Sequence, residues 1–205
     1  MDINNLNANA SGNFEDIECF NVLHIEDDIL QSKYIKEILD LSEGASFNVI
    51  SANALSDGLE YLNKVKFDII LLDLNLPDSY GISTFQKVIN SNRNIPIIVM
   101  TALHKEDIDF SVIRNGAQDV IFKNSFEPKT LIYTLKFAIE KRKYQKALEE
   151  REEKFRTIYN ESPIGIALFN KEGLLIEANN SFCEIIGVND ISALTKWNII
   201  NDTLF

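Results

Sequence analysis

The sequence predicts an α/β fold, namely a doubly wound five-stranded parallel sheet with helices on both faces. Five short runs rich in Val, Ile and Phe alternate strictly with five segments in which apolar residues recur at a helical period. The third and fourth runs are apolar on both faces, which is typical of central parallel strands covered by helices on each side. Repeated βα units of this kind favour a single parallel sheet.

The predicted elements follow one another in regular order. The strands are residues 20–25, 47–51, 67–72, 95–100 and 119–122. The helices are residues 29–41, 54–65, 81–91, 105–115 and a fifth from 128 onward. Asp28, with Gln31 three positions later, forms a capping-box pattern, so we interpret Asp28 as a helix cap and not as a metal ligand.

The fifth helix is expected to be long, because neither Gly nor Pro occurs between Pro128 and Pro163. Its first turns offer Leu131, Leu135 and Ala138 for packing on the sheet. Larger side chains then recur at a seven-residue spacing in a charge-rich background, and they are Phe137, Tyr144, Leu148, Arg151, Phe155 and Ile158. This pattern predicts either a short parallel coiled coil, hence a homodimer through the long helix, or a solvated helix.

After Pro163 the pattern changes again and predicts a partial α+β segment. IGIALFN and LLIEAN flank the turn KEG as a β-hairpin, and NSFCEIIGV follows as a helix with Asn180 or Ser181 near its cap. The predicted organisation is therefore a disordered tail (1–18), an α/β domain (19–127), a long helix (128–160) and a partial domain (161–205).

Charge and hydropathy exclude several classes of function. The chain carries 20 Lys and Arg against 31 Asp and Glu, a net charge of -11, which disfavours binding to nucleic acid. The sequence shows neither a signal-peptide pattern nor an apolar run long enough to cross a membrane. We therefore expect a cytoplasmic protein that binds no nucleic acid and no membrane.

Polar side chains stand at the carboxyl ends of the strands, where doubly wound sheets bind their ligands. They are Glu26 and Asp27 after the first strand, Asp73 after the third, Thr101 after the fourth and Lys123 after the fifth. Clustered carboxylates need a cation, and Mg²⁺ accepts such oxygen ligands. A carboxylate beside this ion can attack phosphorus to form an acyl phosphate, while Lys and a hydroxyl hold the phosphoryl oxygens.

In HIEDD, LLDLNLPD, VMTA and IFKNSF, residues 19–127 resemble the receiver domain of two-component response regulators. The resemblance implies a flavodoxin-like sheet of order 2-1-3-4-5 and a role in phosphorelay signal transduction. It implies that Asp73 accepts a phosphoryl group from a histidine kinase or phosphotransfer protein, with Thr101 and Lys123 contacting that group. A receiver catalyses its own phosphorylation and dephosphorylation and is not a turnover enzyme.

The same resemblance implies a site for Mg²⁺ or Mn²⁺. Its ligands would be Glu26, Asp27, Asp73 and the main-chain carbonyl of Asn75. Two positions depart from the family pattern: Val120 replaces a common aromatic residue, and Asn124 replaces a proline that usually follows a cis peptide bond. Because a cis bond before Asn costs about 3 kcal/mol, we predict a trans bond between Lys123 and Asn124. His24 and His104 are expected to be structural or surface residues.

Residues 152–205 are similar to the beginning of a PAS sensory domain, with Asn179 at that family's frequent polar position. The long helix would then transmit the phosphorylation signal to the PAS-like region. Three alternatives remain open: a non-phosphorylated interaction scaffold, a fragment of a hybrid sensor histidine kinase, and a Mg²⁺-dependent aspartyl phosphatase. For the phosphatase a second Asp is expected two residues after the nucleophile, and Asn75 stands there.

Overall fold

The computed structural model describes residues 17–102, 111–188, 191–194 and 197–200. The chain divides into two compact units, residues 1–143 and residues 144–205. The division falls inside helix α5 (Pro128–Glu161), which is continuous over 34 residues.

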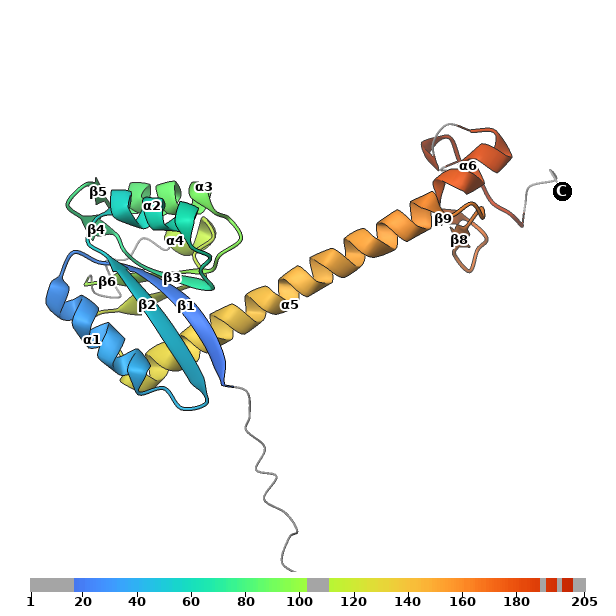
Figure 1. Cartoon of the computed structure of the whole chain (residues 1–205). Helices are drawn as coiled ribbons and strands as arrows, with labels where there is room; N and C mark the ends of the chain where they lie inside the picture. Colours follow the sequence, from blue (N-terminus) through green and yellow to red (C-terminus); the bar gives the residue numbers. More distant parts are fainter. Residues whose placement is uncertain (1–16, 103–110, 189–190, 195–196, 201–205) are drawn as a thin grey trace, which may run out of the picture. The chain divides into compact units, whose positions relative to one another are not determined.

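A five-stranded parallel sheet forms the centre of the first unit (Figure 1). Its strands are β1 (Glu18–Ile25), β2 (Ala45–Ala52), β3 (Ile69–Asp73), β6 (Ile97–Thr101) and β7 (Asp119–Phe122). They lie in the order β2-β1-β3-β6-β7, which confirms the predicted order 2-1-3-4-5. Two strands that were not predicted, β4 (Asn75–Leu76) and β5 (Ser79–Tyr80), form a short antiparallel pair in the loop after β3.

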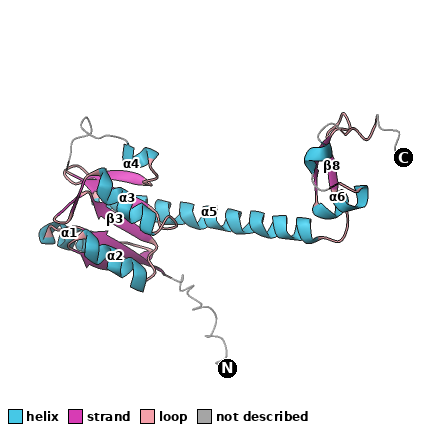
Figure 2. Cartoon of the chain, turned by 90° about the horizontal axis from the view of Figure 1, so that it is seen from above, coloured by secondary structure: helices cyan, strands magenta, loops and turns pink. Residues whose placement is uncertain are grey.

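Helices cover both faces of this sheet, as predicted. Helix α1 (Ile29–Asp40) and the first turns of α5 lie on one face, and α2 (Leu55–Lys64), α3 (Ile82–Ser91) and α4 (Ser111–Arg114) lie on the other (Figure 1). Figure 2 shows α2, α3 and α4 beside one another over the strands. Part of the predicted helix 105–115 lies outside the described residues, and α4 is the part that they include.

Each face of the sheet has its own apolar core. On one face, Val22, Leu71 and Met100 pack with Ile35 of α1 and Leu135 of α5. On the other, residues of α2, α3 and α4 pack on Leu23, Leu72 and Val99, among others. All five residues of β3 and all five of β6 are buried, so both strands are covered on each side. Both central strands are therefore enclosed up to their carboxyl ends.

Helix α5 is anchored to the first unit by its first four turns. Leu131, Leu135, Ala138 and Ile139 are buried against the sheet. Arg142 then donates from Nε to the carbonyl oxygen of Asn94 at 2.9 Å. The predicted packing of this helix on the sheet is confirmed.

The second unit contains the predicted hairpin and helix. Strands β8 (Ala167–Phe169) and β9 (Leu175–Ala178) pair antiparallel, and α6 (Asn180–Ile186) follows, with a 3₁₀ turn, η1, at Ile191–Leu194. The cap residue of α6 is Asn179, and Asn180, predicted to lie near the cap, is the first residue of the helix. Among the described helices of both units, none combines the length and apolarity needed to cross a bilayer.

Candidate functional site

The carboxyl ends of four neighbouring strands bring the predicted site residues to one edge of the sheet. Asp73 and Thr101 are the last residues of β3 and β6, one position later than the predicted strand ends. Lys123 directly follows β7, and its N–H donates to the carbonyl oxygen of Thr101 at 2.8 Å. Glu26 directly follows β1, and its N–H donates to Ala52 on β2 at 2.9 Å.

Lys123 joins two carboxylates that come from different strands. Its Nζ lies 2.7 Å from Oδ2 of Asp73 and 2.5 Å from Oε2 of Glu26. Both carboxylates are buried, with exposed fractions of 6% for Asp73 and 0% for Glu26. A single ammonium group therefore pairs with two acidic groups that burial would otherwise make costly.

Asp27 adds a third carboxylate, and it is exposed. One carboxylate oxygen from each of Glu26, Asp27 and Asp73 can be chosen so that all three lie within 4.8 Å of one another. Three carboxylates against one lysine leave an excess of negative charge, and oxygen donors of this kind suit Mg²⁺ or Mn²⁺. The residues present thus fit the predicted divalent cation.

The ionisation of this cluster reflects burial and mutual attraction. Burial raises the pKa of Glu26, although the hydrogen bond and charge of Lys123 oppose that shift. Burial alone would lower the pKa of Lys123, but its contacts with Asp73 and Glu26 outweigh burial and raise it. Lys123 is therefore a fixed positive charge at neutral pH.

Asp73 is oriented through both of its carboxylate oxygens. Oδ2 meets Lys123, and Oδ1 accepts the N–H of Asn75 at 3.1 Å. Thr101 is 3% exposed at the end of the adjacent strand β6. The structure thus places Asn75 beside Asp73 through its N–H, while the role of its carbonyl as a metal ligand stays a prediction.

One residue near the site has a role that the sequence did not predict. Asp78, in the loop after β3, accepts the N–H groups of Leu55 and Ser56 at 2.8 Å each. Ala54, the N-cap residue of α2, supplies no such bond, so Asp78 caps this helix from another segment. These bonds lower the pKa of Asp78, with the Ser56 N–H contributing most. The sequence held only a weak signal, a carboxylate in the LLDLNLPD loop.

His24 lies near the carboxyl end of β1. It is fully buried, and neither ring nitrogen has a hydrogen-bond partner among the described residues. Its Nε2 lies 4.0 Å from Oε2 of Glu26. Burial, with a smaller contribution from the Lys123 charge, lowers the pKa of His24 to about 3, so the imidazole is neutral. The prediction of a structural residue holds for His24, whereas His104 lies outside the described residues.

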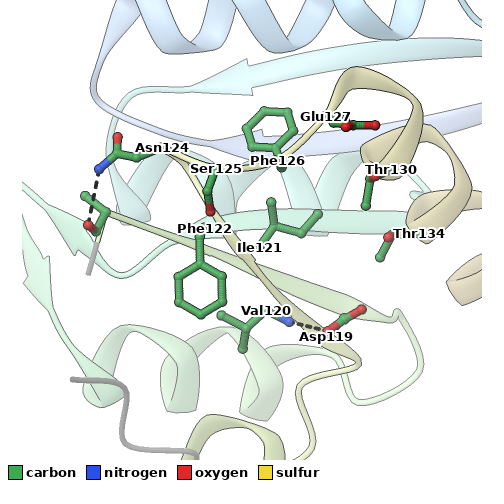
Figure 3. Close-up of a pocket in the computed structure, with 11 residues that line it drawn as sticks. Asp119, Val120, Ile121, Phe122, Asn124, Ser125, Phe126, Glu127, Thr130 and Thr134 are labelled. Carbon is green, nitrogen blue, oxygen red and sulfur yellow. Dashed lines mark hydrogen bonds between the residues drawn. The ribbon is translucent and has the colours of Figure 1, made fainter. Parts of the chain in front are cut away.

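A groove of about 760 Å³ lies beside the edge strand β7 and the first turns of α5 (Figure 3). It extends from Ala102, beside Thr101, to Thr134 on α5. Val120, which replaces the aromatic residue expected from the resemblance, lines the groove and is half-buried. The bond between Lys123 and Asn124 is trans, as predicted, and Asn124 donates from Nδ2 to the Ala102 carbonyl at 3.5 Å.

Two family models match the chain. The model of the response regulator receiver domain matches residues 22–136, which is more than half of the sequence. The model of a PAS domain matches residues 153–204. The receiver match contains every predicted site residue, from Glu26 to Lys123.

Curated relatives match the same region. The swarming motility regulation protein RssB of Serratia marcescens is 33% identical over 103 residues, covering 50% of this chain and 46% of that protein. The cell cycle transcriptional regulator CtrA of Caulobacter vibrioides is 34% identical over 102 residues, covering 50% of this chain and 43% of that protein. The match thus spans less than half the length of each relative.

Solved structures support the fold. The signal receiver domain of a LuxO repressor protein from Vibrio parahaemolyticus has a TM-score of 0.56 at 21% identity, covering 63% of this chain and 97% of that one. A CheY-like receiver domain protein from Methanospirillum hungatei has a TM-score of 0.53 at 22% identity, covering 63% and 98%. At this level of identity the likeness concerns the fold alone.

Proposed function

The chain belongs to the response regulator receiver domain family, a family of two-component signalling, and on this basis we propose that Asp73 is its phospho-acceptor. The donor would be a histidine kinase or a phosphotransfer protein. The observation that carries the proposal is the position of Lys123, whose Nζ contacts both Asp73 and Glu26 while Asp27 stands beside them. A nucleophilic carboxylate, an acidic cation site and a fixed positive charge thus occupy one edge of the sheet.

In the proposed reaction, a carboxylate oxygen of Asp73 attacks the phosphorus of a phosphorylated donor histidine. A P–O bond to Asp73 forms as the P–N bond to the imidazole breaks, and the imidazole nitrogen keeps the electron pair and takes up a proton. Lys123 and the Thr101 hydroxyl then contact the transferred phosphoryl oxygens. The hydrogen bonds already made by both Asp73 oxygens orient the nucleophile before the donor arrives.

The same carboxylates would hold a divalent cation. Glu26, Asp27, Asp73 and the Asn75 carbonyl are the proposed ligands, and the cation would supply positive charge to the phosphoryl oxygens. Phosphorylation would draw Lys123 toward the new group, so its contact with Glu26 would weaken. This rearrangement is the local charge event that we propose as the switch.

The switch would reach other proteins through α5. Only four residues separate Lys123 from the start of this helix, and Leu131 and Leu135 pack directly on the sheet. Helix α5 leads into the PAS-like region, which we propose as the output or sensory part, and a second copy of the chain is a proposed partner of this helix. Signal output would thus depend on protein contacts.

Acyl-phosphate labelling tests the proposal. The full chain is incubated with Mg²⁺ and radiolabelled acetyl phosphate, and label is measured before and after mild alkali, which cleaves acyl phosphates. We expect alkali-labile label on the wild type and on the control Asp119→Asn, whose carboxylate is exposed. We expect none on Asp73→Asn, and equal labelling of Asp73→Asn and wild type would contradict the proposal.

A further inference from the structure

The second half of α5 exposes a row of large side chains. Within the second unit these are Tyr144, Leu148, Phe155 and Ile158, with exposed fractions of 82%, 57%, 62% and 62%. Contiguous exposed apolar side chains of this size mark interaction surfaces more often than bare solvent-facing helix. The remaining helix face carries mainly Glu, Lys and Arg.

The spacing of this row is that of a helix partner. Tyr144, Leu148, Arg151, Phe155 and Ile158 are separated by four, three, four and three residues, which gives the 3.5-residue repeat of a left-handed coiled coil. In heptad terms they occupy positions d, a, d, a and d. We call these five residues the seam. Lys141 takes the preceding a position and bounds the seam on that side.

Arg151, the one charged residue of the seam, indicates which helix the seam can bind. Arg151 occupies a d position, and Glu152 follows it at e. In a parallel, in-register pair of such helices, each d side chain packs into a hole that includes the e residue of the other helix. Each Arg151 would therefore meet the Glu152 carboxylate of the other chain, and these two contacts would offset the repulsion between the two Arg151 side chains of that layer.

A groove beside the seam could receive side chains of a second helix. It has a volume of about 870 Å³ and is lined by Leu148, Arg151 and Phe155 of the seam. Its other side is formed by Ile176 of β9 and by Ile191. Side chains of a partner helix on the seam would cover Ile176, which is 56% exposed. The apolar surface thus extends beyond a single helix face.

We propose that the seam binds the seam of a second copy of this chain, parallel and in register, as a short two-stranded coiled coil. The heptad period selects a helix as the occupant, and the Arg151 to Glu152 match selects an identical helix in register. A charged residue in a seam lowers stability but fixes register and orientation. The proposal is independent of phosphoryl transfer, because neither Asp73 nor the cation site takes part.

Cross-linking of the full chain tests the orientation. Cys19 is exposed and is first replaced by Ser, and then Tyr144→Cys is oxidised mildly. In a parallel, in-register dimer the two d-position cysteines lie within disulfide reach, so we expect a covalent dimer. The control Lys146→Cys, on the outer face of the helix, should stay monomeric under the same oxidation. Cross-linking only between Tyr144→Cys and Ile158→Cys chains would show an antiparallel pair and overturn the proposal.

Charge exchange tests the register. Arg151→Glu replaces each pair of Arg151 and Glu152 between the two chains with two carboxylates that repel each other. We therefore expect the dimer dissociation constant, measured by sedimentation, to rise about tenfold. Adding Glu152→Arg should restore most of the affinity, because the pairs form again with reversed signs. A wild type that is monomeric at all concentrations, or an unchanged dissociation constant for Arg151→Glu, would overturn the proposal. Labelling of Asp73 can be measured on the same proteins and reports separately on phosphoryl transfer.

Discussion

At the residue scale, Lys123 decides how the acidic cluster is held. Its contacts with Glu26 and Asp73 leave Asp27 as the exposed carboxylate of the three. A cation that binds here would therefore depend on Asp27 as its accessible ligand. The adjacent Asp28 has a different task, since its carboxylate caps α1 by accepting from the N–H of Leu30 at 2.8 Å and that of Gln31 at 3.2 Å. The side chain of Gln31 does not complete the box, because the Asp28 N–H donates to Glu26.

These two neighbouring aspartates provide a matched pair of variants. We predict that Mg²⁺ raises the melting temperature of the wild type and of Asp28→Asn, which keeps a capping side chain. Asp27→Asn should lose most of this stabilisation. For the wild type, bound Mg²⁺ adds about 2.7 kcal/mol to the free energy of unfolding when its concentration is about 100 times its dissociation constant. Thermal melts with and without Mg²⁺ measure the effect. An equal Mg²⁺ response from Asp27→Asn would exclude Asp27 as a ligand.

His24 is a buried polar residue whose nitrogens have no partner in the described chain. We predict that His24→Leu raises the free energy of unfolding by about 1–2 kcal/mol, because burial of an unpaired polar group is costly. Thr84→Val is the control, since the buried Thr84 hydroxyl donates a hydrogen bond to the Leu74 carbonyl at 3.0 Å. Its removal should lower the free energy of unfolding by about 1 kcal/mol. Urea unfolding measures both. A loss of stability in His24→Leu would show that the imidazole has a partner.

At the element scale, Asp78 links the loop after Asp73 to helix α2. Removing this cap in Asp78→Ala should cost about 1 kcal/mol of unfolding free energy at neutral pH. The folded-state pKa of Asp78 is lowered, so this contribution is present above the unfolded pKa and is lost as the pH falls through the folded pKa.

The pH dependence separates charge from packing in this cap. The stability difference between wild type and Asp78→Ala should be full at pH 7 and should shrink as the pH falls through the lowered pKa of folded Asp78. Asp78→Asn, which keeps an acceptor without the charge, should show an intermediate loss with little pH dependence. Urea titrations at several pH values measure this. A difference that grows in acid would contradict the assignment.

Asn179 holds the second unit together at the junction of three segments. Its side chain is fully buried, accepts the N–H groups of Ile166 and Phe182, and donates to the carbonyls of Tyr159 and Ile164. The end of α5 is thereby fastened to the hairpin and to α6.

We predict that Asn179→Ala destabilises the second unit by about 2–4 kcal/mol, since buried backbone groups lose their partners. Amide hydrogen exchange at Ile166 and Phe182 should accelerate accordingly. The control is Asn180→Ala, at the exposed neighbouring position, where a change within about 0.5 kcal/mol is expected. Equal exchange rates in the two variants would show that the carboxamide is dispensable.

At the scale of the whole molecule, the sequence predicted the features that follow from the spacing of apolar residues and from the order of the strands and helices along the chain. Alternating apolar runs gave the parallel sheet, and its topology brought Asp73, Thr101 and Lys123 to one edge. Features that depend on the path of a loop were not predictable in this way. The Asp78 cap joins residues 23 positions apart, and the β4 to β5 pair of two-residue strands is too short to show a period.

Other differences have simple physical causes. Apolar content predicted β3 to end before Asp73, but the strand continues through it because the backbone pairing with β6 extends to Met100. The sequence placed the start of α6 near Asn180 without naming Asn179 as its cap, and Asn179 takes that role because its side chain reaches the Phe182 N–H from the end of β9. Lys123 was identified as a site residue from its position after a strand. Its contacts with Glu26 and Asp73 could not be predicted, because they depend on the fold of the backbone.

The most direct measurement maps the phosphoryl group to a single residue of the whole chain. After incubation with Mg²⁺ and acetyl phosphate, borohydride reduces an aspartyl phosphate to homoserine, and peptide mass spectrometry locates the change. We expect homoserine in place of Asp73 and unmodified Asp27 and Asp78. Homoserine at another aspartate, or unmodified Asp73 under conditions that label the chain, would contradict this expectation.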